Sequence, residues 1–397
     1  MFYSSFFPLN NTIKDYEWGS KSSLKELFGF ENKSNAHQAE LWMGIHPCGC
    51  SLVKVDTEEI SLSSLINRDK DDILSKRVSD EFGELPFLFK VLAAESPLSV
   101  QVHPNKTQAI DGFNTENELG ISIDSAIRNY KDENHKPELV YAITQFQVMA
   151  GFKSYQEINE CWSYFSVPKI DKAFNGQVEI NNDHDLELFF SILLTLSGDD
   201  KIDAVSQLKN YVKDHKYDHH SILVNDLLQR YADDLGAFSP LLLNVFTLNP
   251  GQSLFITSGI PHAYIHGTAL EVMANSDNVL RAGLTNKNID IVELTKCTNF
   301  KPTAISELIC NPVSIAGNIS RYEVPVSDFC FEVYSNSQNQ LISVDSAEIV
   351  FSLDDSLTLR HESGEVMTID KGDSVFIPHY AKSYSISAIG RVIRVFC

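Results

Sequence analysis

Two runs of β-forming residues stand out in the first third of the chain. Residues 86–92 and 98–103 are rich in Val, Leu and Phe, and Ser96-Pro97 interrupts the pattern between them. The two runs predict a pair of strands joined by a short connection.

Further along, the spacing of apolar residues becomes helical. Between residues 155 and 243 apolar side chains recur every three or four positions, as at Val224, Leu227, Leu228 and Tyr231. This spacing predicts helices that bury one face.

Short strand-like runs return after this helical stretch, at residues 253–256, 348–351 and 374–377, with turn residues between them. The order β-rich, helical, β-rich predicts jelly-roll or barrel-like domains interrupted by a helical insertion. With 397 residues the chain is long enough for two or three domains of roughly 150 residues each.

The overall charge excludes two classes of partner. The chain has 32 Lys and Arg against 53 Asp and Glu, a net charge of −21, so we expect neither nucleic acid nor a membrane surface as a partner. The start of the chain does not resemble a secretion signal, and the longest apolar run, residues 188–196, is far shorter than the roughly 20 residues that cross a bilayer. Seven irregularly spaced cysteines predict reduced thiols. We therefore expect a cytoplasmic protein.

Side chains that bind metals occur in three separate places. Strand alternation puts Gln101 and His103 on one face, although the pair also suits an ordinary polar strand face. Glu138 starts an apolar segment directly after Pro137, where a carboxylate needs a partner, and His262 follows a Gly-containing turn. Two imidazoles, an amide and a carboxylate are compatible with zinc and an open coordination position. Spacing alone does not bring them together.

Four long motifs resemble one family of enzymes. They read AELWMG at residues 39–44, QVHP at 101–104, RNYKDENHKPE at 128–138 and LEVMANSDNVLRAGLT at 270–285. In these motifs the chain resembles the type I mannose-6-phosphate isomerases. The resemblance implies a phosphosugar substrate, one zinc ion per chain, and interconversion of mannose 6-phosphate and fructose 6-phosphate.

The resemblance also implies a fold. It is mainly β with a helical insertion, and comprises two cupin-like jelly-roll barrels and an α-helical domain. We expect residues 1–152 and 239–314 to form the zinc-binding cupin-like catalytic domain, residues 153–238 the helical domain, and residues 315–397 a C-terminal cupin-like β domain. The sequence does not indicate an oligomeric state and is compatible with a monomer.

Site residues carry over from the family motifs position by position. The implied zinc ligands are Gln101, His103, Glu138 and His262, and Arg281 matches the family's catalytic arginine. His266 is an alternative ligand, because alternation along a strand would place it on the face of His262.

Further positions match the substrate site of the family. Lys136 is implied to contact substrate and to take part in catalysis, and Tyr264, Trp18 and Asp277 match pocket positions. Lys90 is a candidate for phosphate contact and equally for a snorkelling surface lysine. Because the whole chain is acidic, attraction of a dianionic substrate has to come from local cations. The available ones are Lys136, Lys90, Arg281, Arg128 and Lys131.

The reaction that the resemblance implies requires a proton to move between C2 and C1 through a cis-enediol. Zinc and Arg281 would stabilise the enediolate oxygen. Glu271 is the leading candidate for the base, although it could instead orient another pocket group; His135 and a zinc-bound hydroxide are alternatives.

Two other functions fit a cupin with these ligands. One is a sugar-binding or regulatory protein without turnover, and the other is a ferrous oxygenase, because imidazole and carboxylate ligands also suit iron. The amide of Gln101 and the lysine-rich approach to Glu138 favour a redox-inert metal and a phosphorylated substrate.

Overall fold

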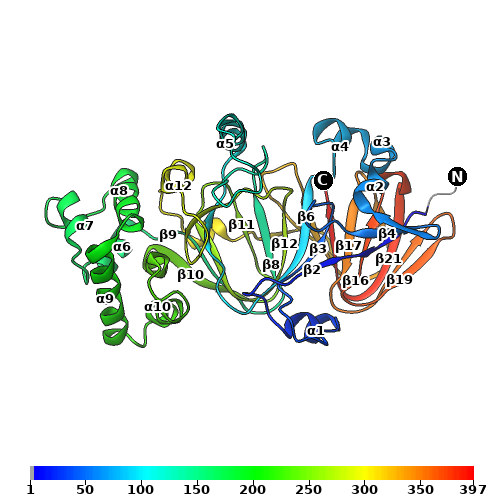
Figure 1. Ribbon diagram of the computed structural model, residues 1–397. Helices are drawn as coiled ribbons and strands as arrows, with labels where there is room; N and C mark the ends of the chain where they lie inside the picture. The colour runs from blue at the N-terminus through cyan, green and yellow to red at the C-terminus, as the bar shows by residue number, and fades with distance from the viewer. Residues whose placement is uncertain (1–3) are drawn as a thin grey trace.

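The computed structural model describes residues 4–397. Figure 1 shows three regions side by side: green helices at one end, a β-sheet in the middle, and the orange and red strands of a second sheet at the other end. Within the described range the two sheets have ten and eleven strands.

The ten-stranded sheet contains the segments that the sequence motifs single out. Its main path runs β10-β9-β12-β6-β3-β2, and β7, β8, β11 and β13 join it through further pairings. Its strands are β2 (Thr12–Lys14), β3 (Glu40–Met43), β6 (Phe87–Ala94), β7 (Val100–Val102), β8 (Glu138–Ala142), β9 (Phe146–Phe152), β10 (Leu243–Leu248), β11 (Ser253–Ile256), β12 (His262–Ala274) and β13 (Leu280–Gly283). The long strand β12 pairs with β6, β7, β8 and β9 and is the centre of the sheet.

The eleven-stranded sheet combines the C-terminal strands with three strands from the start of the chain. Its strands are β1 (Phe7–Asn10), β4 (Leu52–Val55), β5 (Glu58–Ser61), β14 (Pro312–Ala316), β15 (Ile319–Tyr322), β16 (Cys330–Ser343), β17 (Glu348–Ser352), β18 (Leu357–His361), β19 (Val366–Ile369), β20 (Ser374–Ile377) and β21 (Ser383–Phe396). Strand β1 pairs with β20 on one side and with β4 on the other. The first and last parts of the chain are therefore hydrogen-bonded to each other, and the expected four-segment division into domains stays a prediction.

The helical insertion lies between β9 and β10, as the change of apolar spacing predicts. It consists of α6 (Tyr155–Trp162), α7 (Pro168–Ala173), α8 (Asp183–Leu194), α9 (Gly198–Asp214), α10 (His219–Arg230), η1 (Leu235–Phe238) and α11 (Ser239–Leu242). The other helices are α1 (Ser23–Phe28), α2 (Leu62–Ile66), α3 (Lys70–Leu74), α4 (Lys76–Glu81), α5 (Lys106–Glu118), α12 (Ile291–Cys297), α13 (Ile305–Leu308) and η2 (His379–Ala381). Across residues 4–397, none of the helices has the length and apolar character that crossing a membrane requires.

One apolar core joins the two sheets. Phe89 of β6 has its ring centroid 6.4 Å from that of Phe331 on β16 and 6.0 Å from that of Phe351 on β17. All three rings are fully buried. Because aromatic pairs at these separations bury large apolar areas, these rings exclude water where the two sheets meet.

The expected fold class is confirmed: the chain is mainly β with a helical insertion. The strands predicted at residues 86–92, 98–103, 253–256 and 374–377 correspond to β6, β7, β11 and β20. All seven cysteines are unpaired, as the irregular spacing predicts.

Candidate metal centre

Strand register brings distant residues into one row. His262 on β12 lies opposite Gln101 on β7, and Arg281 on β13 lies opposite Gln101 on the other side. Residues that face each other in an antiparallel pair point to the same side of the sheet. His262, Gln101 and Arg281 are therefore neighbours on one face, although up to 180 positions separate them in the sequence.

His103, which follows β7, and Glu138, which begins β8, complete the cluster. His103 Nε2 lies 3.2 Å from Glu138 Oε1, and His262 Nε2 lies 3.4 Å from Glu138 Oε2. The three side chains are at most 3% exposed. The structure thus brings both predicted imidazoles to the carboxylate of Glu138.

The hydrogen bonds of the two imidazoles decide which nitrogen is free. His103 Nδ1 lies 2.7 Å from the carbonyl oxygen of Asn278, and His262 Nδ1 lies 2.9 Å from that of Ile260. A carbonyl only accepts, so each Nδ1 donates and, in the neutral ring, each Nε2 carries a lone pair. Both lone pairs then face the oxygens of Glu138, and His103 Nε2 makes no hydrogen bond of acceptable geometry.

Such an arrangement fits a cation between the three groups. Lone pairs of two imidazoles and a carboxylate repel one another unless a positive centre lies among them. Burial and then the Lys136 ammonium lower the pKa of His103 to about 4, which keeps its ring neutral and able to coordinate metal at neutral pH. Nitrogen and oxygen donors of this kind suit zinc.

Glu138 is held as a carboxylate. Burial alone would raise its pKa, but Lys136, whose Nζ lies 3.2 Å from Oε1, holds the pKa well below its usual range. The Tyr264 hydroxyl donates to Oε2 at 2.7 Å. Glu138 is therefore charged and fixed in orientation.

A second group of charges lies beside the first. Lys90 Nζ is 2.8 Å from Glu271 Oε2 and 3.6 Å from Glu40 Oε1. Lys90 is 5% exposed, so its interpretation as a surface lysine is wrong. Burial would lower the pKa of Lys90, but Glu271 and Glu40 raise it above its usual range. Burial raises the pKa of Glu271, and Lys90 opposes that rise.

A single small pocket connects the two groups. Its polar lining consists of Glu40, Lys90, Gln101, Lys136, Glu138, His262, Tyr264 and Glu271, and Leu92, Leu98 and Ala263 complete the wall. A carbonyl compound in this pocket would lie next to the candidate metal ligands Glu138 and His262. It would also lie next to the carboxylate of Glu271 and the ammonium groups of Lys90 and Lys136. This is the arrangement needed to move a proton next to a stabilised oxyanion.

Arg281 is close to other cations and lacks a counter-charge. Among residues 4–397 no carboxylate offsets the burial of its guanidinium, which lowers the pKa of Arg281. Partial desolvation, followed by the charges of Arg281 and Lys131, lowers the pKa of Lys287 in the loop after β13. The sequence motifs did not identify Lys287; its position six residues after Arg281 was the available signal.

Trp18 and Asp277 lie outside the lining of the pocket. Trp18 stacks on Tyr16 with ring centroids 5.8 Å apart. Burial would raise the pKa of Asp277, but His46, whose Nε2 lies 3.3 Å from Oδ1, lowers it to about 2.

His46 and Asp277 gather with Cys48 so that their ligand-type atoms lie within 4.8 Å. The backbone N–H of Cys48 donates to His46 Nδ1 at 3.2 Å. His46 Nε2 therefore carries the proton toward Asp277 and has no lone pair for a metal.

Three other sequence interpretations need correction. His266 is exposed, because a register shift between Tyr264 and His266 interrupts the alternation of β12. His135 points away from the pocket, with Nε2 3.0 Å from both carboxylate oxygens of Asp328. Arg128 is buried, and its Nε lies 3.0 Å from Glu116 Oε2, so its charge is not available to a substrate.

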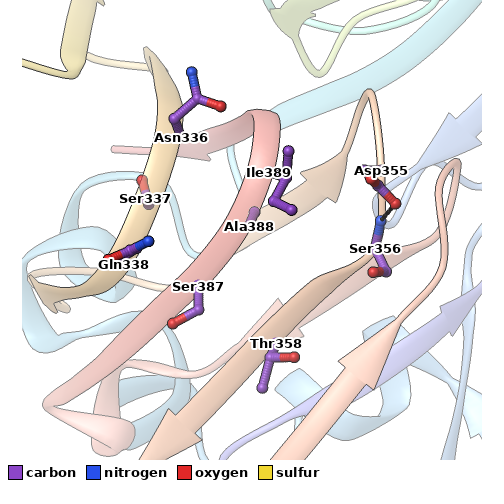
Figure 2. Close-up of a pocket in the computed structure, with 9 residues that line it drawn as sticks. All are labelled: Asn336, Ser337, Gln338, Asp355, Ser356, Thr358, Ser387, Ala388 and Ile389. Carbon is purple, nitrogen blue, oxygen red and sulfur yellow. Dashed lines mark hydrogen bonds between the residues drawn. The ribbon is translucent and has the colours of Figure 1, made fainter.

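A wider pocket of about 400 Å³ lies on the eleven-stranded sheet (Figure 2). Its lining comes from β16, β18, β21 and the turn before β18, and includes Asn336, Gln338, Asp355 and Ser387. It shares no lining residue with the pocket at the metal cluster.

Comparison with known proteins places the chain in a family. Residues 6–155 match the phosphomannose isomerase type I catalytic domain, and residues 318–397 match the mannose-6-phosphate isomerase cupin domain. Mannose-6-phosphate isomerases are 41% identical in Salmonella typhimurium and 42% in Escherichia coli, each over 98% of both chains. The Homo sapiens protein of that name is 32% identical over 94% of this chain and 93% of its own length.

Solved structures agree with the sequence relatives. A zinc-bound mannose 6-phosphate isomerase has a TM-score of 0.92 and 40% identity, with 99% of both chains covered. The Salmonella typhimurium enzyme bound to substrate (f6p) and zinc gives the same TM-score, identity and coverage. This chain therefore belongs to the type I phosphomannose isomerases and is an isomerase.

Proposed function

We propose that this chain is a zinc-dependent aldose-ketose isomerase that interconverts mannose 6-phosphate and fructose 6-phosphate. The observation that carries the proposal is the convergence of two imidazole lone pairs on a buried carboxylate, with no proton between them. Family membership adds the substrate, because a relative is known bound to zinc and f6p.

Gln101, His103, Glu138 and His262 are the residues that would hold zinc. Zinc bound there would supply a Lewis acid that polarises oxygen atoms of the sugar. The remaining chemistry falls to side chains of the pocket, and each has a separate part in it.

Glu271 is the proposed base. Its carboxylate lines the pocket, and burial raises its pKa toward the range in which a base transfers protons efficiently. Lys90 is not suited to this part, because two carboxylates hold it protonated. Glu271 takes the proton from C2 and returns it to C1 on the same face of the cis-enediol, while the proton of the C2 hydroxyl moves to the oxygen on C1.

Lys136 and Arg281 are proposed to stabilise the oxygen that becomes negative when C2 loses its proton. Lys136 lines the pocket next to Glu138. Arg281 lies beside Gln101 in the sheet and has no carboxylate partner, so its charge is available to an anion.

The phosphate is proposed to bind at the cations around Arg281. Lys287 and Lys131 are near enough for their charges and that of Arg281 to affect one another. Such a cluster is unfavourable by itself and becomes favourable when a dianion lies among its members.

Metal removal tests the proposal. Protein treated with a chelator should lose mannose-6-phosphate isomerase activity, and stoichiometric zinc should restore it. Activity that persists in metal-free protein would contradict a zinc enzyme. Stoichiometric iron accompanied by oxygen consumption would instead support the ferrous oxygenase, and zinc binding without turnover would support the non-catalytic cupin.

A further inference from the structure

The segment that carries the pocket lysine is held from two sides. We call residues 131–138 the substrate loop, since it contains Lys131, Lys136 and Glu138. On one side, the Asn278 side chain accepts the backbone N–H of Lys131 at 2.7 Å and donates to the carbonyl oxygens of Asp132 and Asn134, both at 2.8 Å. The loop is thus fixed to the segment between β12 and β13.

On the other side, the loop contacts the segment that leads into the eleven-stranded sheet. His135 Nε2 lies 3.0 Å from each carboxylate oxygen of Asp328, which lies two residues before β16. Asp328 is 3% exposed. Within residues 4–397 His135 is the only side chain whose donor reaches this carboxylate. A buried carboxylate with a single partner depends strongly on that contact.

The position of Asp328 is itself fixed by the core. The next residue, Phe329, is fully buried in the apolar core that joins the two sheets. Asp328 therefore presents its carboxylate from a rigid support, and the imidazole of His135 is aligned against it. His135 directly precedes Lys136, whose ammonium lies 3.2 Å from Glu138.

From this geometry we infer that Asp328 is a positioning residue for the isomerase reaction. It acts through His135, and aligns the substrate loop so that Lys136 and Lys131 meet the substrate. The C-terminal domain therefore contributes to catalysis without a residue in the pocket. The inference rests on the proposed function of Lys136 and Lys131 as substrate contacts.

A double-mutant cycle on zinc-loaded full-length enzyme tests the inference. Asp328→Asn removes the charge at nearly constant volume, and His135→Ala removes its partner. Each variant should raise KM for mannose 6-phosphate and lower kcat/KM about tenfold, the loss expected for one charge-assisted hydrogen bond. The double variant should lose no more than either single variant, because each substitution abolishes the same charge-assisted hydrogen bond.

Ser327→Ala is the matched control. Ser327 is next to Asp328, but its hydroxyl donates to Glu81 of α4 and does not contact the loop, so its kcat and KM should equal those of the parent. Melting temperature and zinc content of each variant separate positioning from damage to the fold. A smaller fraction of folded enzyme lowers kcat alone, whereas a misaligned loop raises KM.

Two results would overturn the inference. One is a KM of Asp328→Asn within twofold of the parent value, and the other is an additive loss in the double variant. Lys136→Met in the same assay separates the two proposals. If Lys136→Met impairs the enzyme and Asp328→Asn does not, only the inference fails; if Lys136→Met has no effect, the proposed function of the loop fails.

Discussion

At the scale of single residues, the candidate centre depends on where protons are. Backbone carbonyls take the Nδ1 protons of His103 and His262, and Lys136 keeps Glu138 ionised. The donor set is therefore prepared for a cation before one binds, which lowers the cost of reorganisation.

The assignment of Glu271 as the base predicts a pH profile. Burial raises its pKa, so the acid limb of kcat/KM should lie above the usual range of a glutamate, and activity should fall as the pH drops through that pKa and the base becomes protonated. Glu271→Gln should lower kcat roughly 100- to 10,000-fold and abolish the limb. The exposed Glu118→Gln on α5 serves as the control, and a Glu271→Gln enzyme with an unchanged profile would rule out this base.

Lys287 provides a second test at this scale. If it contacts the phosphate, Lys287→Met should raise KM for mannose 6-phosphate about tenfold and change kcat much less, since the lost contact is a charge-assisted one. Lys201→Met on α9 changes the same charge in the helical insertion and should have no effect. Steady-state kinetics of both variants measure the effect. If Lys287→Met and Lys201→Met had equal KM values, Lys287 would not contact the phosphate.

At the scale of elements, strand β12 positions His262 and Glu271 on opposite sides of an irregularity. The register of β12 against β9 shifts between Tyr264 and His266. Gly267 follows with φ +117°, and a Cβ atom there would lie 2.2 Å from the carbonyl oxygen of Gln145. The irregularity thus needs glycine at this position.

Gly267→Ala should therefore destabilise the protein. The alanine Cβ would clash with the carbonyl oxygen of Gln145, and the positive φ would be strained. We expect these two effects to lower the free energy of unfolding by about 3 kcal/mol. Denaturant unfolding measures the effect. Gly317→Ala, with no atom within 4 Å of its Cβ, should stay within about 0.5 kcal/mol of the parent, and an equally small change at Gly267 would contradict the argument.

Runs of β-forming residues and helical spacing of apolar residues predict strands and helices that do not depend on contacts with distant segments. Strands β6, β7 and β11 follow from runs of β-formers, and the helical insertion follows from its spacing. His266 was misjudged as a competing ligand because alternation assumes a regular strand. The exposure of His266 and the orientation of His135 toward Asp328 both depend on contacts between distant segments, which one sequence does not reveal.

Whole-molecule organisation was the least predictable level. The family motifs predicted that Gln101, His103, Glu138 and His262 lie together. These motifs all lie within residues 1–152 and 239–314, so they do not predict how the C-terminal strands pack against the rest. No local pattern indicates that β1 pairs with β20, or that Phe89 packs against Phe331 and Phe351.

The shared core predicts that the two sheets unfold together. Phe89→Ala should lower the free energy of unfolding by roughly 3–5 kcal/mol, the usual cost of removing a buried aromatic ring. Calorimetry of the metal-free parent and variant should show one transition, at a lower temperature in the variant. Two separate transitions, with only one shifted, would indicate sheets that are stable independently.

The pairing of β1 with β20 also bears on how the protein is made. Residues 7–10 leave the ribosome more than 350 residues before their partner at residues 374–377. During translation the early strand has an unsatisfied edge, and such edges promote aggregation. The nascent chain therefore reaches its final topology only after residues 374–377 have emerged, so protection by chaperones is most important during that interval.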